Sequence, residues 1–196
     1  MIDFTDRSKF TEDRFTPANE FCRHPEYYHS PDSEATELEV TEFIGALVRL
    51  VQPELVVETG TYHGHTAQEI CEQLVWNNHG KLVTIEKDAA AFGIAAVSLD
   101  YYEDSDLVEL IHGNSLDYIP TQQIDLAFFD SWQEGRHLEF MHFYNMGVLS
   151  AGATVVFHDT APHHLVHTYV KQLEADGYIK TLTFHTPRGI TIGQVL

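Results

Sequence analysis

The stretch Leu55-Val56-Val57-Glu58-Thr59-Gly60-Thr61-Tyr62-His63-Gly64-His65-Thr66 decides the fold of this chain. Its apolar run predicts a buried parallel strand, and the two glycines that follow predict a tight turn that opens a helix. The glycine spacing differs from G-x-G-x-x-G of dinucleotide sites and from G-x-x-x-x-G-K-[ST] of triphosphate sites. The loop carries the carboxylate of Glu58 and no Lys or Arg. It therefore favours a ligand with positive charge and no phosphate, the alternative being an ordinary strand-to-helix turn.

Short apolar runs alternate with helix-like stretches along the rest of the chain. Strands are predicted at 55–58, 82–86, 108–112, 124–130, 154–158, 180–186 and 191–195. Helices are predicted at 37–51, 65–76, 89–101, 116–119, 136–149 and 163–176. This alternation predicts an α/β fold with a mostly parallel sheet. The turn Pro187-Arg188-Gly189 is too short for a crossover helix, so the last two strands are predicted to form an antiparallel hairpin at one sheet edge.

The composition narrows the class of protein. With 196 residues, of which 43% are hydrophobic, the chain can bury one substantial core. Its formal net charge of -19 argues against nucleic-acid partners and against anionic membranes. No apolar run reaches the ~18 residues of a membrane span, and Cys22 and Cys71 form no C-x-x-C motif. We therefore expect a cytoplasmic protein without a disulfide framework.

The N-terminal region differs in kind from the rest of the chain. Residues 1–35 interleave aromatic and charged residues without a clear period, whereas residues 36–196 carry the alternating pattern of one domain. The extension would serve as a lid over a substrate pocket, as an arm for a homodimer, or only as a segment draped over the core.

Polar residues follow five predicted strands where these strands end. They are Glu58, Glu86, the run Gly113-Asn114-Ser115, Asp130 and the pair His158-Asp159. Ligands of open α/β sheets bind beyond the carboxyl ends of the strands, so we expect these residues to meet at one site. The Glu86 carboxylate suits two ribose hydroxyls, whereas Asn114 and Ser115 suit either an adenine edge or a turn. S-adenosylmethionine, a nucleoside with sulfonium and ammonium groups, fits such a loop.

These motifs resemble class I S-adenosylmethionine-dependent methyltransferases, most closely the catechol and caffeoyl-CoA type of small-molecule O-methyltransferase. The resemblance covers roughly residues 37–196, in the family's order and spacing. It implies a Rossmann-like fold, with helices on both faces of a seven-stranded sheet, and S-adenosylmethionine as cofactor. The residues expected around this cofactor are Glu58, Gly60, Thr61, Tyr62, Gly64, Thr66, Glu86, Lys87, Asn114, Ser115, Asp130 and Trp132.

The resemblance also implies a divalent cation, usually magnesium, held by Asp130 and Asp159 and orienting an acceptor hydroxyl. Two departures from the family stand beside this expectation. Thr160 replaces the asparagine of the metal site, and Gln133 replaces the lysine that acts as base. His158 is then the candidate base, or a ligand for a transition metal, and Asp130 is the second candidate catalytic residue. The alternative is that both carboxylates bind the cofactor amine or cap helices.

The leading hypothesis is methyl transfer from S-adenosylmethionine to a small-molecule hydroxyl, by in-line attack on the sulfonium methyl. Two alternatives stay open: a metal-independent N- or C-methyltransferase, and a cofactor-binding protein without turnover. The expected partner is a small-molecule acceptor, with homodimerisation as a further option. His63 and His65 are spaced like a chelate, but we expect them to be exposed to solvent.

Overall fold

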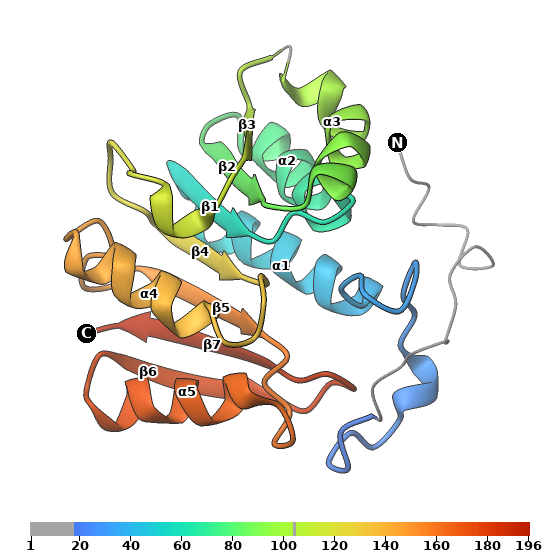
Figure 1. Cartoon of the computed structure of the whole chain (residues 1–196), viewed down its shortest axis with the longest axis vertical. Helices are drawn as coiled ribbons and strands as arrows, with labels where there is room; N and C mark the ends of the chain where they lie inside the picture. The colour runs from blue at the N-terminus through green and yellow to red at the C-terminus, as the bar shows by residue number, and fades with distance from the viewer. Residues whose placement is uncertain (1–17, 104) are drawn as a thin grey trace.

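One mixed sheet organises the computed structural model, which describes residues 18–103 and 105–196. Its strand order is β3-β2-β1-β4-β5-β7-β6 (Figure 1). The strands are β1 (Leu55–Thr59), β2 (Lys81–Glu86), β3 (Val108–His112), β4 (Leu126–Phe129), β5 (Thr154–His158), β6 (Ile179–Phe184) and β7 (Ile190–Val195). The first five strands pair in parallel, whereas β7 runs antiparallel to both β5 and β6. The predicted α/β fold with a C-terminal hairpin is confirmed.

Helices cover both faces of the sheet, as Figure 1 shows. They are α1 (Leu38–Val51), α2 (His65–Asn77), α3 (Ala89–Glu103), α4 (Arg136–Asn145) and α5 (Leu165–Ala175), with short 3-10 turns at Pro25–Tyr27 and Ser115–Asp117. Apolar side chains of α1, α2 and α3, such as Ile44 and Ile70, pack on one face. Those of α4 and α5, such as Phe140 and Val170, pack on the other. Among the described residues, no helix is long and apolar enough to cross a membrane.

Several helix boundaries differ from the sequence prediction by one to four residues, and the predicted helix at 116–119 is a 3-10 turn at Ser115–Asp117. α4 ends at Asn145 instead of residue 149, because Gly147 takes a φ of 71° and turns the chain back toward the sheet. The apolar residues Val148 and Leu149, which prompted the longer prediction, pack on the core from a loop instead. α5 begins at Leu165 instead of residue 163, since His164 has the extended backbone of an N-cap.

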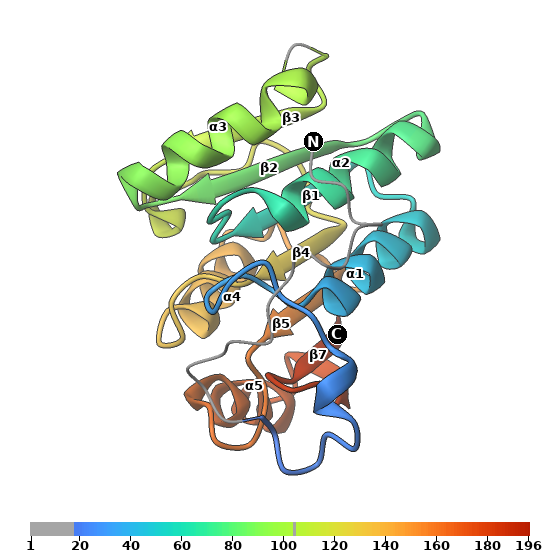
Figure 2. The same cartoon turned by 90° about the vertical axis from the view of Figure 1, so that its right-hand side faces the viewer.

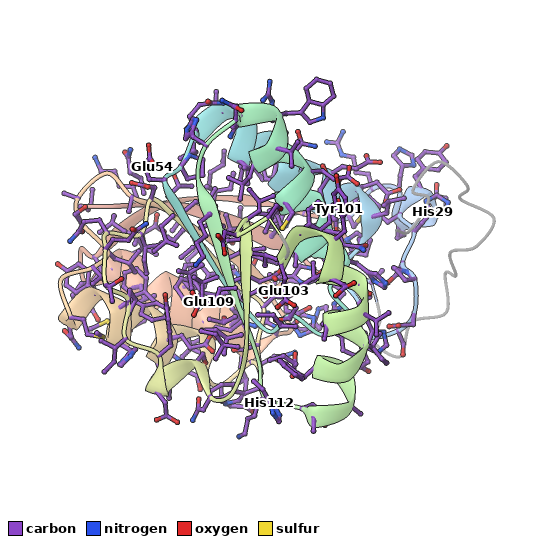
Figure 3. All side chains as sticks on the ribbon, turned by 90° about the horizontal axis from the view of Figure 1, so that it is seen from above. His29, Glu54, Tyr101, Glu103, Glu109 and His112 are labelled. Carbon is purple, nitrogen blue, oxygen red and sulfur yellow. The ribbon has the colours of Figure 1, made fainter. Side chains whose placement is uncertain are left out.

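The carboxyl ends of the parallel strands share one edge of the sheet. In Figure 3, Glu54, which precedes β1, marks the amino ends of the parallel strands, and His112, which ends β3, marks their carboxyl ends. Residues 18–37, called the strap below, cross the carboxyl edge beside β4 and β5 (blue in Figure 2). The strap is tied to the β6–β7 turn, where the backbone N–H of Asn19 donates to the Pro187 carbonyl at 2.8 Å. A role of residues 1–35 as lid or dimer arm stays a prediction, and residues 1–17 lie outside the described part.

Candidate active site

The loop between β1 and α2 packs directly against the segment that follows β4. Gly60 has a φ of 85°, and a Cβ at this position would lie 2.5 Å from the carbonyl oxygen of Asp130. Tyr62 also has a positive φ, 51°, and its backbone N–H donates to a carboxylate oxygen of Glu86 at 2.7 Å. Gly64, with a φ of 86°, is the N-cap of α2. Glycine is required at position 60 because no side chain fits there.

A pocket of ≈ 640 Å³ opens beside this loop. Its volume lies within the range of small-molecule sites. Most residues expected around the cofactor line it: Gly60, Thr61, Tyr62, Thr66, Glu86, Lys87, Asn114, Ser115, Asp130 and Trp132. The sequence therefore identified four strand ends that meet at one pocket, as the topology of open α/β sheets requires.

Glu58 and Gly64 are not among the lining residues of this pocket. Glu58 lies beneath the loop with 1% of its surface exposed, and its carboxylate accepts a hydrogen bond from the Thr84 hydroxyl at 2.5 Å. Burial raises the pKa of Glu58 to about 8, although the Thr84 hydrogen bond opposes this shift. The side chain is therefore placed to support the strand ends from beneath the loop, and a contact between its carboxylate and the cofactor stays a prediction.

Glu139, which the sequence analysis did not single out, connects three of the site's loops. It lies fully buried on α4. Its carboxylate accepts hydrogen bonds from three hydroxyl groups, those of Thr59, Ser115 and Ser131. Burial raises the pKa of Glu139, while these hydrogen bonds oppose the shift. One side chain thus holds the ends of β1 and β4 and the turn after β3 in fixed positions.

His158 does not have the properties of a catalytic base. Its side chain is fully buried, with Nε2 2.7 Å from Glu37 and Nδ1 3.0 Å from Asp130. Burial favours the neutral ring, but the carboxylates of Asp130, Asp159 and Glu37 outweigh it and raise the pKa of His158 to about 9. Both ring nitrogens therefore carry protons at neutral pH. Both ring nitrogens of His158 are taken up by carboxylates in this structure, which argues against a role as base or as transition-metal ligand; that role stays a prediction.

Asp159 is bound by two arginines. Arg188 donates to both of its carboxylate oxygens, from Nε at 2.6 Å and from Nη2 at 3.0 Å. Arg136, the first residue of α4, donates to one of these oxygens at 2.8 Å and lies 3.0 Å from Asp130. Burial opposes ionisation of Asp159, yet the two guanidinium groups and His158 lower its pKa below the ordinary range. Asp159 is thus an ionised carboxylate inside a dense cationic shell.

The expected metal site can be compared with these contacts. Ligand atoms of Asp130, His158 and Asp159 lie within 4.8 Å of one another, close enough to surround a cation. However, the same carboxylate oxygens already accept hydrogen bonds from guanidinium, imidazolium or hydroxyl groups. A divalent cation at this place would have two guanidinium groups as neighbours and would have to displace these donors, so the arrangement does not fit one.

The two residues that depart from the family pattern have separate environments. Gln133 lines the pocket, and its Nε2 lies 2.8 Å from Nδ1 of His164. Burial lowers the pKa of His164 to about 4, so its ring is neutral and can accept this hydrogen bond. Thr160 is buried and accepts a hydrogen bond from the Thr191 hydroxyl of β7 at 2.8 Å. Gln133 therefore faces the pocket, while Thr160 contacts β7 of the C-terminal hairpin.

His63 and His65 both line the pocket, contrary to the expectation of solvent exposure. The rings of Tyr62 and His63 stack with centroids 3.7 Å apart. Nδ1 of His65 is buried and has no hydrogen-bond partner within the described structure. Burial lowers the pKa of His65 to about 4, so its ring is uncharged at neutral pH.

Several residues of the site gave no signal that the sequence analysis used. They are Thr36 and Glu37 at the end of the strap, Arg136 and Glu139 of α4, and Arg188 of the β6–β7 turn. Charged residues in helices and turns usually face solvent, so their burial cannot be read from the residue type alone. The Pro187-Arg188-Gly189 turn was interpreted only as a chain reversal.

The sheet order and the pocket at its carboxyl edge define a Rossmann-like, class I methyltransferase architecture. Residues 57–160, more than half of the chain, match the methyltransferase domain family, and the chain belongs to this family. Catechol O-methyltransferase B of Danio rerio is 29% identical over 121 residues, which cover 58% of this chain and 43% of the relative. Catechol O-methyltransferase of Mus musculus is 25% identical over 122 residues, covering 59% and 45%. The matches thus span less than half of these relatives.

Solved structures share the fold at lower sequence identity. The O-methyltransferase TomG of Streptomyces achromogenes, in complex with S-adenosylmethionine, has a TM-score of 0.68 and 23% identity, covering 85% of this chain and 83% of its own. A methyltransferase of Podospora anserina with bound S-adenosylhomocysteine has a TM-score of 0.73 and 18% identity, covering 83% and 80%. At these sequence identities the likeness supports the fold assignment and does not identify a substrate.

Proposed function

We propose that this chain transfers a methyl group from S-adenosylmethionine to a hydroxyl group of a small molecule. The observation that carries the proposal is the position of Glu86. Its carboxylate ends β2 on the pocket wall, and it also accepts the backbone N–H groups of Tyr62 and Asp88, each at 2.7 Å. These contacts orient the carboxylate where a ribose with two neighbouring hydroxyls would lie.

The remaining walls suit the other parts of the donor. Thr66 and the backbone at Gly60 line the pocket at the start of α2, where the methionine part would lie. Trp132 and Asn114 line it as well, and an adenine ring would lie beside them. Trp132 is 41% exposed, with the Lys87 ammonium 5.9 Å from its ring centroid, so a planar ligand can still stack on it. The pocket thus offers acidic and aromatic side chains to a nucleoside without phosphate groups.

In this proposal the chain's main contribution is alignment of the acceptor oxygen with the sulfonium methyl group. The acceptor would enter beside Asp130, whose carboxylate lines the pocket and receives a hydrogen bond from the Thr36 hydroxyl at 2.6 Å. Asp130 would take the hydroxyl proton at Oδ2, which accepts the Thr36 hydroxyl, while Oδ1 faces Arg136 and His158; Gln133 cannot serve, because its amide does not take a proton at neutral pH. The net charge of -19 favours a small acceptor over a nucleic acid.

Because both ring nitrogens of His158 contact carboxylates, a second candidate function is also supported. An enzyme that methylates nitrogen or carbon needs neither a metal nor the lysine base that Gln133 replaces. A protein that binds the donor without turnover would have the same pocket. Both alternatives share the donor site with the proposed function; the first differs in the acceptor atom, and the second transfers no methyl group.

Calorimetry with S-adenosylhomocysteine tests the donor site. The wild type should bind it, and Glu86→Gln should weaken binding at least ~10-fold, since a hydrogen bond to a charged group contributes about 1.5–3 kcal/mol. Glu109→Gln is the matched control: Glu109 lies on β3 and its side chain is 51% exposed (labelled in Figure 3). No binding by the wild type, or equal binding by both variants, would contradict the donor site.

A panel of phenols, aliphatic alcohols and amines with methyl-labelled donor then tests the reaction. We expect label in the hydroxyl acceptors. Label only in amines would support the N-methyltransferase, and product formation with none of them, despite donor binding, would favour a protein without turnover.

A further inference from the structure

Arg188 connects three separate parts of the acceptor side of the pocket, by which we mean the part beside Asp130 and Asp159. It lies in the turn between β6 and β7, and its Nε and Nη2 groups bind Asp159 at the end of β5. Its Nη1 group donates to the backbone carbonyls of Glu34 and Ala35 in the strap, both at 3.1 Å. Its backbone N–H donates to Glu37 at 3.1 Å. A cation at this place therefore fastens the hairpin, the strap and β5 together.

Arg136 makes the corresponding connection from α4. Its Nε donates to the Ser131 carbonyl at 2.9 Å, and its Nη1 to the carbonyl of His158. Its Nη2 lies between Asp130 and Asp159, at 3.0 and 2.8 Å. The carboxylates that end β4 and β5 are thus bridged by one guanidinium group. A bridging position between two strand-end carboxylates is also where a shared metal ion would have to lie.

Acidic and basic side chains are paired in this cluster. Arg136 lies against both Asp130 and Asp159, Arg188 lies against Asp159, and His158 lies between Asp130 and Glu37. A divalent cation between the two aspartates would lie against these guanidinium groups in a largely buried region, where like charges repel strongly. The arginines and a divalent cation therefore compete for the same carboxylate oxygens.

We propose that Arg136 and Arg188 together take the place that a divalent cation occupies in catechol-type enzymes, so that the acceptor side works without a metal. Both arginines line the pocket beside Asp130. This proposal rests on the proposed function. The two guanidinium groups would stabilise the negative charge that develops on the acceptor oxygen. An acceptor with a single hydroxyl group would then serve as well as one with two neighbouring hydroxyls.

Metal binding to the full-length chain tests this proposal without any assay of methyl transfer. Protein treated with a chelator and dialysed is mixed with Mg²⁺ or Mn²⁺, and metal content and thermal unfolding are measured. We expect far less than one metal ion bound per chain and an unchanged melting temperature. A stoichiometric metal ion, or a melting temperature that rises with metal concentration, would overturn the proposal.

Substitution of one arginine gives the reciprocal test. Arg188→Met leaves the carboxylates in excess, so its melting temperature should fall and Mn²⁺ should restore part of the loss. Arg188→Lys keeps the positive charge and is the variant to use if Arg188→Met does not fold. A single ammonium group cannot bind both carboxylate oxygens of Asp159, so this variant should also gain a response to Mn²⁺. Arg49→Met, at an exposed arginine of α1, is the control and should not respond.

If neither Arg188 variant responds to Mn²⁺, the carboxylates are no cation site, and the equivalence of arginine and metal is overturned. Binding of S-adenosylhomocysteine, measured on the same samples, reports on the proposed function separately. A wild type that binds this nucleoside and no metal satisfies both proposals, whereas binding of metal with intact nucleoside affinity overturns only this one.

Discussion

Replacement of Glu58 by glutamine should remove a large part of the pH dependence of stability. Glu58 is buried beside Thr84 and Cys71, and the carboxylates of Asp130 and Glu86 add repulsion. Burial is the largest cause that raises its pKa from 4.5 to about 8. Between these two values the folded chain keeps a proton that the unfolded chain has lost. The free energy of unfolding must therefore fall as pH rises through this window, and the loss is complete above about pH 8.

The size of the effect follows from the same two values. One pH unit corresponds to about 1.4 kcal/mol, so the whole window amounts to ~5 kcal/mol and its part below neutral pH to ~3 kcal/mol. Glu58→Gln keeps the shape of the protonated acid and can still accept the Thr84 hydroxyl, but it has no proton to lose. Relative to wild type, the variant should therefore gain several kcal/mol as pH rises from the lower to the upper end of this window.

Urea unfolding of wild type, Glu58→Gln and the exposed control Glu109→Gln across this window measures the difference. The reasoning is refuted if the stability of Glu58→Gln stays parallel to that of wild type at all pH values. Since Glu58 does not line the pocket, the same variant should bind S-adenosylhomocysteine with an affinity within ~3-fold of wild type. A loss of ~10-fold or more would instead restore Glu58 as a donor-binding residue.

Gly60→Ala should destabilise the chain by ~2 kcal/mol or more and abolish measurable nucleoside binding, because the new Cβ would lie 2.5 Å from the Asp130 carbonyl oxygen at a φ of 85°. Gly93→Ala, at a position on α3 that does not line the pocket and where a Cβ would meet nothing within 4 Å, is its control in thermal unfolding and calorimetry, and equal behaviour of the two variants would refute the argument. Glu139→Ala should lower the free energy of unfolding by ~2–4 kcal/mol and weaken nucleoside binding, while Glu139→Gln should recover part of both. An unchanged affinity in Glu139→Ala would show that the pocket loops do not depend on this carboxylate, which binds three hydroxyls: Thr59, Ser115 and Ser131.

The fold could be predicted because its signals are local. The central parallel strands are buried on both faces and therefore appear as short, mostly apolar runs, as in Leu55–Thr59, whereas the outer strand β3 is partly exposed. The donor side of the pocket was predictable for a related reason. Glu86 and Asp130 follow directly after such runs, and parallel strands bring their carboxyl ends to one edge.

The acceptor side could not be predicted in this way, because its contacts join distant parts of the chain. His158 meets Glu37 across 121 residues, and Arg188 reaches the Glu34 carbonyl across 154. From its position alone, a histidine at a strand end is a reasonable base. Only its two carboxylate partners reveal that the ring is a fixed cation. Nothing local distinguishes an arginine that binds a buried acid from one that faces solvent.

The attachment of the strap to the β6–β7 turn has a consequence for the order of folding during synthesis. The strap is synthesised well before Arg188 and the Pro187 carbonyl that hold it, since Arg188 lies 154 residues after Glu34. Contacts between such distant parts of a chain form late in folding. The nucleoside side, built from β1 to β4, can therefore assemble on a nascent chain, while the acceptor side is completed only after the β6–β7 turn has been synthesised.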